Sequence, residues 1–413
     1  MTKEYFRSKN TILKAVLLLF VVVSSILTAR DGGDFDVFLN AAQKLNNGQN
    51  IYQPPFAKGL QYYYSVFFAL VLIPFSYQIF ITEVLWSLLS YFLLYRTFKL
   101  AQGYFDFSTF TKKQYHTWVI LTALLSLQFI LYNVAMVQIT IFLLWTIFES
   151  IHLMETKKNI LGGTLLGMAI NIKIMPVLIL PYLFYRGYFK AFLIAVFTFI
   201  ALLYLPAVFI GQEYNQFLLS EWWLIINPGQ KEHLFETGIG MHSITAMLPV
   251  YLTETTGEMD YQRNILNIDP QYIGLIINIA RLFILSLSLF YLRSWPFKKE
   301  NDPLKSYWEI SFFVLTIPLL LPHQQKYAFL LAIPMVSYLL YFFIKTFDRQ
   351  QDIRYRIALY TFVISMLVYS PLYGMDVIGK FLFKFTQHYR VMTFCTLLLI
   401  PVSIYCNPKK RPF

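Results

Sequence analysis

Three carboxylates, Asp31, Asp34 and Asp36, follow the first long apolar stretch of the chain. They lie where a hydrophobic helix would leave a membrane, and a carboxylate held against such a low-dielectric boundary loses hydration. We interpret Asp34 as a general base, with the N-cap of the next helix as the alternative role. For Asp31 and Asp36, a supporting or metal-binding role and that of a solvated acid both stay open.

A second set of polar side chains is embedded in otherwise apolar segments. Cations there bring charge and hydrogen-bond donors suited to a phosphate, which makes Lys173, Lys326 and Arg281 candidate phosphate-binding residues. His323 is the second candidate catalytic residue. The candidate substrate-binding residues are Asp36, Gln138, Tyr62, Gln324 and His242.

Structural alternatives exist for several of these residues. Lys173 could be a snorkelling lysine at a helix end, and the charge of Arg281 could be balanced by a salt bridge to another helix. Gln138 is of a type that forms hydrogen bonds between membrane helices, and Tyr62 suits an interfacial aromatic belt.

Several catalytic classes are excluded by the motifs that the sequence lacks. It contains no phosphate-binding Gly-rich loop ending in Gly-Lys-Ser/Thr, no dinucleotide-binding Gly-x-Gly-x-x-Gly after a strand and no His-Glu-x-x-His. The two cysteines, Cys395 and Cys406, lie in one late hydrophobic segment and indicate neither a disulfide framework nor a metal site.

Composition identifies the environment in which these residues act. Hydrophobic residues make up 57% of the chain, charged residues only 14%, and the mean hydropathy is +0.53, which excludes an ordinary water-soluble globule. We predict an all-α polytopic membrane protein: a single domain over residues 1–413, with about 12–13 transmembrane helices and short extracytoplasmic surface helices. The net charge of +12 is divided into small clusters between apolar runs, which is a topology pattern rather than a nucleic-acid surface.

Hydrophobic periodicity predicts the elements that position the polar residues. Residues 11–29 form an uncleaved first helix, and 34–47 form an amphipathic helix on the membrane surface. Two helical hairpins follow, one turning at Tyr132-Asn133 and one at Lys173.

The distribution of basic residues sets the orientation. Most Lys and Arg residues fall in clusters on one side of the predicted spans, and most acids fall on the other. We therefore place the N-terminus in the cytoplasm. A first loop, 30–61, and a long loop, 211–270, lie outside, together with the turns at Lys173 and His323.

A polar face of this kind suits transfer of a sugar carried on a lipid phosphate, because the phosphate is itself the leaving group. The protein then supplies a base for the acceptor hydroxyl and positive charge for the phosphate. Such a transfer requires no cofactor. A role for a divalent metal stays open. The alternative is a transporter or flippase of a lipid-linked sugar, but alternating access needs polar groups near the membrane midplane, and this chain gathers them on one face.

The segment Asp34-Phe-Asp-Val-Phe38 with Ala41-Ala42, Gly48 and Tyr52, followed by Tyr62 through Pro74, resembles the first extracytoplasmic loop of polyprenyl-phosphate-sugar-dependent glycosyltransferases. It resembles most closely glycosyltransferase family 87, the mycobacterial α-1,2-mannosyltransferases of phosphatidylinositol mannoside synthesis. A more distant similarity is to the eukaryotic first mannosyltransferase of GPI assembly. The resemblance extends to Val137-Gln-Ile-Thr140, to Gly162 through Pro176, and to the His323 turn.

This resemblance implies a GT-C fold and inverting transfer from a β-linked polyprenyl-phosphate sugar, with Asp34 as the base. The expected sugar is mannose or a pentose, with mannose favoured, and a lipid-linked or cell-envelope glycan is the expected acceptor. The expected location is a bacterial-type inner membrane.

Overall fold

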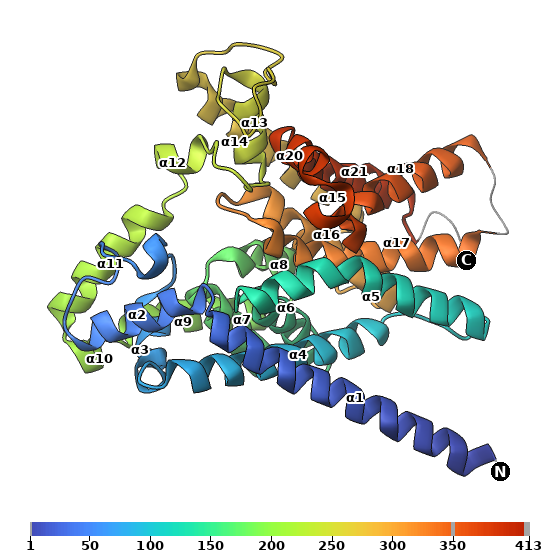
Figure 1. The fold of residues 1–413 in the computed structure, drawn as a ribbon, viewed down its shortest axis with the longest axis horizontal. Coiled ribbons are helices and arrows are strands. Elements are labelled where there is room, and N and C mark those ends of the chain that lie inside the picture. The colour runs from blue at the N-terminus through green and yellow to red at the C-terminus, as the bar shows by residue number, and fades with distance from the viewer. Residues whose placement is uncertain (1, 348–351, 409–413) are drawn as a thin grey trace.

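The protein is described by a computed structural model that covers residues 2–347 and 352–408. All regular secondary structure in those ranges is helical, which confirms the predicted all-α class (Figure 1). The elements of the first half are α1 (Thr2–Asp31), α2 (Phe35–Asn46), η1 (Ala57–Gly59), α3 (Val66–Leu72), η2 (Ile73–Phe75), α4 (Ile79–Gln102), α5 (Lys112–Ala135), α6 (Thr140–Glu155), α7 (Asn159–Ile172), η3 (Met175–Ile179), α8 (Leu180–Tyr185), α9 (Phe189–Tyr204) and α10 (Ala207–Ile210). Those of the second half are α11 (Gln212–Ile226), α12 (Lys231–Leu234), α13 (Ile244–Leu252), α14 (Pro270–Ser286), α15 (Ser288–Leu292), α16 (Pro303–Leu320), η4 (Lys326–Ala332), α17 (Ile333–Thr346), α18 (Ile353–Tyr369), η5 (Pro371–Tyr373), α19 (Met375–Ile378), α20 (Lys380–His388) and α21 (Val391–Tyr405).

Several helices are long and apolar enough to cross a membrane. Among the described residues there are five, or up to seven if each of two bent helix pairs is one span. The five are Ile79–Gln102, Lys112–Ala135, Phe189–Ile210, Pro270–Leu292 and Lys326–Thr346. A polytopic membrane protein is thereby confirmed, whereas the total of about 12–13 spans stays a prediction, because other apolar helices such as α7 are short.

Helix α2 confirms the amphipathic helix expected after the first span. Its apolar residues Phe35, Phe38, Leu39 and Leu45 are almost completely buried. They pack within the protein, next to α3, rather than against lipid. This packing fixes the position of α2. It therefore also fixes the segment just before α2, which carries Asp34.

Close packing of small residues joins α7 to α9. A Cβ atom added to Gly163 would lie 2.6 Å from the backbone oxygen of Ala191, and one added to Gly167 would collide with the oxygen of Ala195. Both helices thus carry small residues four positions apart, the pattern that lets membrane helices approach closely and gain van der Waals contact. This contact holds the end of α7 that leads to Lys173.

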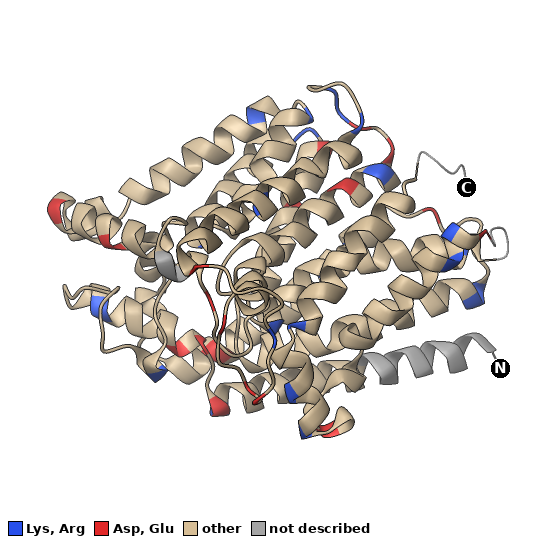
Figure 2. Ribbon diagram, turned by 90° about the horizontal axis from the view of Figure 1, so that it is seen from above, with Lys and Arg blue, Asp and Glu red and all other residues tan. Residues whose placement is uncertain are grey.

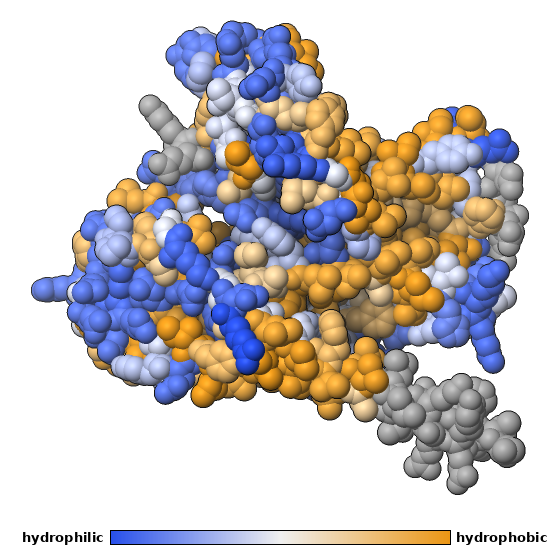
Figure 3. Space-filling model, viewed as in Figure 1, coloured by the Kyte–Doolittle hydropathy of each residue, from blue (hydrophilic) through white to orange (hydrophobic). Residues whose placement is uncertain are grey.

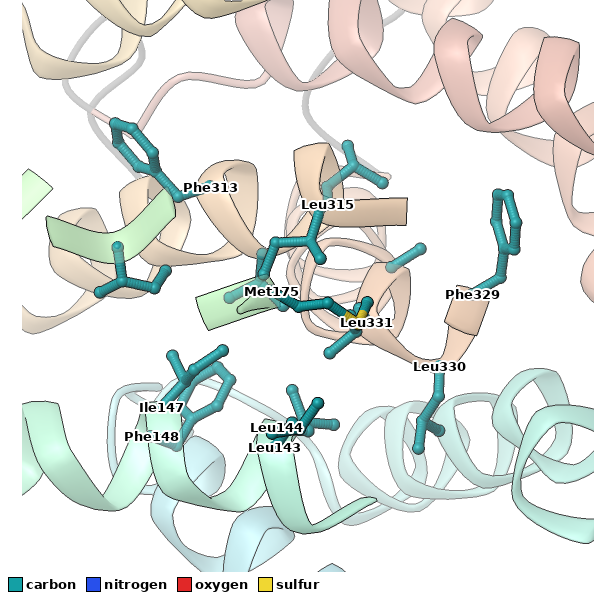
Figure 4. Packing of buried hydrophobic residues seen from close by; sticks show 14 of the residues in the cluster. Leu143, Leu144, Ile147, Phe148, Met175, Phe313, Leu315, Phe329, Leu330 and Leu331 are labelled. Carbon is teal, nitrogen blue, oxygen red and sulfur yellow. The ribbon is translucent and has the colours of Figure 1, made fainter. Parts of the chain in front are cut away.

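The centre of the bundle is filled by side chains from α6, α16 and η4. Leu144 and Phe148 of α6 point towards Met175 of η3. Leu315 of α16 lies beyond Met175, and Leu330 of η4 lies to one side (Figure 4). These residues are at most 4% exposed, so the turn between α16 and η4, which carries His323, rests on a rigid core.

One predicted turn is wrong. Helix α5 does not end at Tyr132-Asn133 but continues to Ala135, and the chain turns over residues 136–139, with Val137 at φ 48°. The reason is a tertiary partner: the Asn133 amide donates to the carbonyl oxygens of Phe129, 2.8 Å away, and Tyr327, 2.9 Å away. A residue that favours turns in isolation is therefore satisfied inside a helix.

A buried ionic cluster joins α8 to α16. The Arg186 guanidinium donates to both carboxylate oxygens of Glu309, with Nε 2.9 Å from Oε2. Lys305 Nζ lies 3.3 Å from Glu309 and 2.6 Å from Glu300. Two positive and two negative charges thus balance inside the protein, which offsets their loss of hydration.

Charge and hydropathy follow the helix arrangement. Charged residues lie mainly at helix ends and in connections (Figure 2). Hydrophilic residues gather over α2, α11 and α13, whereas hydrophobic residues cover the flank that runs from α1 towards α5 (Figure 3). The polar end over α2 and α11 is the end at which the connections carrying the predicted site meet.

Candidate active site

A cavity of about 630 Å³ lies where the connections at this end of the bundle converge. Asp34, between α1 and α2, lies on one wall, together with Gln138 from the turn between α5 and α6. Lys173, after α7, and His323, after α16, lie on the same cavity. The remaining lining residues are Val37, Phe38, Phe56, Gly59, Leu60, Gln61, Tyr63, Tyr64, Ile174, Met175, Val177, Ile225, Ile226, Pro228, His233, Met241, Leu321, Pro322, Gln324, Gln325 and Tyr327.

Asp34 is positioned by the turn between α5 and α6. Its backbone N–H donates to the carbonyl oxygen of Met136 at 2.9 Å, and its Oδ2 accepts a hydrogen bond from the side-chain amide of Gln138. Gly33 permits this approach, because a Cβ atom there would lie 2.5 Å from the Met136 oxygen. Within the described chain, the Asp34 side chain makes no capping hydrogen bond to α2, so it is directed to the cavity rather than to the helix.

The electrostatics of Asp34 suit a base. Burial raises the pKa of its carboxyl because a low-dielectric site disfavours the charged form. The hydrogen bond from Gln138 and the charges of Lys58 and Lys173 act in the opposite direction. The carboxyl is therefore more basic than an exposed aspartate while it keeps partners that stabilise its ionised form.

Asp36 points to a different partner. Its Oδ2 lies 2.8 Å from Lys58 Nζ, and the same ammonium donates to the carbonyl oxygen of Gly33 at 3.1 Å. Asp36 lies outside the cavity lining as described. Lys58, which sequence reasoning missed, thus ties η1 to the loop that carries Asp34. No periodic pattern marks it, since its role depends on the fold of 53–61.

Lys173 lies between α7 and η3, with its ammonium in the cavity wall. It donates to the Tyr64 hydroxyl at 3.2 Å and lies 4.9 Å from the centre of the same ring and 5.9 Å from that of Tyr327. Burial lowers the pKa of Lys173 to about 8, and Asp34 opposes this shift. Its side chain is half-buried and lies in an aromatic setting, with its ammonium held at the Tyr64 hydroxyl.

His323 occupies a strained turn, with φ 55°. Its Nδ1 lies 2.6 Å from Oε1 of Glu236, its Nε2 lies 2.8 Å from Nδ1 of His233, and its ring stacks on Tyr63 with centres 5.4 Å apart. Sequence reasoning missed Glu236 and His233 as site residues. They precede His323 in the chain by 87 and 90 positions, and only the fold brings them to it.

Gln324 and His242 are coupled through the backbone. The His242 N–H donates to the Gln324 carbonyl oxygen at 2.8 Å, while the Gln324 side chain lines the cavity. His242 itself is buried behind the cavity wall at 1% exposure. Burial, together with the charges of Arg390 and Lys326, lowers the pKa of His242 to about 3, so its ring is neutral.

Three other predicted residues lie outside the cavity lining as described. Lys326 follows the His323 turn, on the side of His242. The Arg281 guanidinium donates to the carbonyl oxygen of Leu320 at 3.0 Å and to that of His233 at 3.5 Å. It forms no salt bridge with a described residue. Tyr62 is buried and donates to the Ser65 carbonyl oxygen at 2.9 Å, and its neighbours Tyr63 and Tyr64 face the cavity instead.

In the described part of the chain, no group of three or more His, Cys, Asp or Glu side chains is arranged to hold a metal ion. Independence from metals and cofactors stays a prediction.

Fold and site together define an all-helical, multi-pass membrane protein with a polar cavity at one end of its helices. Comparison with protein families adds the particular class: the glycosyltransferase family 87 sequence model matches residues 62–255. This match supports assigning the chain to glycosyltransferase family 87, confirms the resemblance, and indicates a membrane glycosyltransferase. The matched range contains Gln138, Lys173 and His233. Neither the curated proteins nor the solved structures provide a match.

Proposed function

We propose that this protein transfers a sugar, with mannose the expected one, from a polyprenyl-phosphate donor to a lipid-linked or cell-envelope glycan, with inversion at the anomeric carbon. The observation that carries the proposal is that the Asp34 carboxylate and the Lys173 ammonium line one cavity. A base for an acceptor hydroxyl and a cation for a departing phosphate are the two groups that such a transfer requires.

In this reaction the acceptor oxygen attacks the anomeric carbon while Asp34 takes its proton. The bond from the anomeric carbon to the phosphate oxygen breaks, and its electron pair leaves with the phosphate. Lys173 supplies the positive charge that offsets the charge gathering there, and His323 lies on the same cavity, where its ring can contact the phosphate. The aromatic and aliphatic lining, which includes Phe56, Leu60 and Ile225, suits the first prenyl units of the donor.

The order of the helices supports an extracytoplasmic cavity in a bacterial-type inner membrane. Helix α5 begins near Lys112 and ends next to Gln138, α6 returns to the Lys157-Lys158 pair, and α7 leads back to Lys173. The basic residues therefore share the end of these helices opposite to the cavity. Lys and Arg favour the cytoplasmic side, so the proposal places the N-terminus in the cytoplasm and Asp34 outside.

The test is a radiolabelled transfer assay with the purified protein, a panel of polyprenyl-phosphate sugars, and extracted envelope lipids, run with and without a chelator. The proposal predicts label transfer from a polyprenyl-phosphate sugar, with polyprenyl-phosphate mannose the best donor. Transfer from nucleotide sugars alone would contradict the donor class. Loss of transfer with chelator, restored by a divalent cation, would contradict metal independence.

A further inference from the structure

The connection between α15 and α16 presents two large apolar side chains to the outside of the protein. Trp295 is 86% exposed, and Phe297 is 55% exposed. Both come shortly after Leu292, at which a candidate membrane span ends, so they lie near the level of a membrane surface. Tryptophan at this level typically places its ring among lipid headgroups. The exposure of these side chains therefore indicates contact with a membrane surface rather than with water.

Four exposed cations accompany these two side chains. They are Arg293, Lys298 and Lys299 of the same connection and Lys190 of α9. Lys190 belongs to the group because it follows Phe189, whose ring centre lies 5.3 Å from that of Phe297. Among the described residues, none of the four cations has a salt-bridge partner. This surface thus carries positive charge that the described chain does not balance, which suits an anionic partner.

The acid next to these cations in the chain is engaged elsewhere. Glu300 directly follows Lys299, but its Oε2 lies 2.6 Å from Nζ of Lys305, within the buried ionic cluster of α8 and α16. The ammonium of Lys299 lies 4.6 Å from the centre of the Tyr188 ring instead. A cation over an aromatic ring keeps its charge, so Lys299 stays available to an anion.

Buried groups hold this connection in one conformation. The Arg186 guanidinium donates to the Ser294 hydroxyl at 2.5 Å and to the carbonyl oxygen of Lys298 at 3.3 Å. The Phe297 N–H donates to the carbonyl oxygen of Tyr185 at 2.6 Å. The cations and aromatic side chains are therefore carried by a fixed backbone, which reduces the entropy lost when a ligand binds.

Phe297 adopts a backbone conformation that is costly for its residue type. Its φ is 64°, in the left-handed region, and its ring packs on those of Phe184 and Phe189. Gly187 permits this approach, because a Cβ atom there would lie 2.6 Å from the Phe297 carbonyl oxygen. This arrangement places the connection between the span that begins at Phe189 and the one that ends at Leu292. A basic surface between the ends of two spans is a typical place for the headgroup of an anionic lipid.

We propose that residues 293–299, together with Lys190, bind the headgroup of an anionic phospholipid. The cations contact its phosphate, and Trp295 and Phe297 lie beside the first segments of its acyl chains. A soluble anion would use the cations but leave both aromatic side chains in water, so the occupant is a lipid. This surface lies at the far end of α8 from Lys173, which lines the cavity, so the lipid site is separate from the proposed sugar transfer.

The test is quenching of tryptophan fluorescence by brominated lipids, with the full-length protein in phosphatidylcholine nanodiscs. The chain has seven tryptophans, so the Trp295 signal is the difference between the wild type and Trp295→Phe. The half-quenching fraction is the share of brominated lipid that gives half of the maximal quenching, measured for phosphatidylglycerol and for phosphatidylcholine. For Trp295 we expect it to be about tenfold lower with brominated phosphatidylglycerol, since each basic residue near a membrane surface contributes roughly a fivefold preference for anionic lipid. Equal fractions, or a Trp295 signal that neither lipid quenches, would overturn the proposal.

Variants then locate the site, each measured with and without Trp295→Phe. Lys298→Gln combined with Lys299→Gln is expected to bring the two half-quenching fractions close together, and a difference that persists would contradict the assignment of these lysines. The matched control is Lys112→Gln combined with Lys113→Gln, an exposed pair at the start of α5, which should keep the wild-type difference. An equal loss of the difference in this control would show that net charge alone is responsible and would overturn the site.

Inorganic phosphate distinguishes a lipid site from a site for a soluble anion. Added to wild-type nanodiscs at constant ionic strength, it is expected to leave the quenching by brominated phosphatidylglycerol unchanged. Relief of this quenching by phosphate would overturn the lipid as the occupant. None of these measurements involves sugar transfer, so their outcome is separate from that of the proposed function.

Discussion

The carboxylate of Asp34 accepts a hydrogen bond from the side-chain amide of Gln138, which follows it by 104 positions in the chain. The same two segments are joined by the backbone bond from Asp34 to Met136. The loop between α1 and α2 and the turn between α5 and α6 are thus one structural unit. Its geometry decides where the proposed base points and how readily it ionises.

Replacing Gln138 by Leu removes the donor that stabilises the Asp34 carboxylate. We expect the pKa of Asp34 to rise and kcat at neutral pH to fall about tenfold, because a hydrogen bond to a charged group contributes about 1.5–3 kcal/mol. The measurement is kcat against pH, with the exposed Gln230→Leu as control. An acid limb in the Gln138→Leu profile that coincides with that of the wild type would contradict this role.

The pH profile of transfer should be bell-shaped. Asp34 must be ionised to act as a base, so activity rises with pH through its raised pKa. Lys173 must be protonated to attract a phosphate, so activity falls as pH rises through about 8. Lys173→Arg is expected to move the alkaline limb to higher pH, since arginine stays protonated.

The comparison for this prediction is the exposed Lys190→Arg, which should leave both limbs in place. Lys173→Met should raise the KM for donor strongly at all pH values. An alkaline limb that remains near pH 8 in Lys173→Arg would show that another group is responsible.

Lys58 is expected to affect activity more than stability. Its ion pair with Asp36 is partly exposed, so Lys58→Met should change the free energy of unfolding by about 1 kcal/mol or less. The same change removes a positive charge that lowers the pKa of Asp34, so transfer should decline, most of all at acidic pH. Thermal unfolding and kcat/KM measured on the same preparation test this; a large loss of stability with unchanged kcat/KM would contradict it.

The Arg186–Glu309 pair should matter for stability alone. Arg186→Met leaves a carboxylate buried without its main partner and should destabilise the protein by about 3–5 kcal/mol. Adding Glu309→Gln should recover part of this loss, which thermal unfolding in nanodiscs will show, with the exposed Arg354→Met as reference. A double variant that is less stable than Arg186→Met would mean that the two side chains do not act as a pair.

Local sequence patterns were sufficient to predict a helix or a break where the environment of each residue is set by its neighbours in the chain. The periodicity of 34–47 predicted α2, and the break at Lys173 was visible between two apolar runs. The turn at Tyr132-Asn133 was wrong because the partner that satisfies Asn133 is Tyr327, almost two hundred residues away. A pattern within one segment contains no information about such a partner.

The site residues also divide into those that the sequence could indicate and those that depend on distant partners. Asp34, Lys173, His323, Gln138 and Gln324 could be selected because polar residues in apolar segments need a reason, and the structure brings them to one cavity. Arg281 and Lys326 satisfied the same criterion, but both lie outside the described lining of the cavity. The type of a residue does not reveal where the fold directs its side chain. Glu236 and His233 lie in a polar loop, where acids and histidines are ordinary, so only their contacts with His323 distinguish them.

The most direct test of the account is sugar transfer by Asp34→Asn, assayed with a polyprenyl-phosphate sugar and envelope lipids. Asparagine keeps the shape of the side chain but cannot accept the acceptor's proton. The account predicts that transfer falls to background while donor binding and thermal stability stay close to those of the wild type and of the exposed control Asp260→Asn. Transfer by Asp34→Asn at the wild-type rate would contradict the assignment of Asp34 as the base.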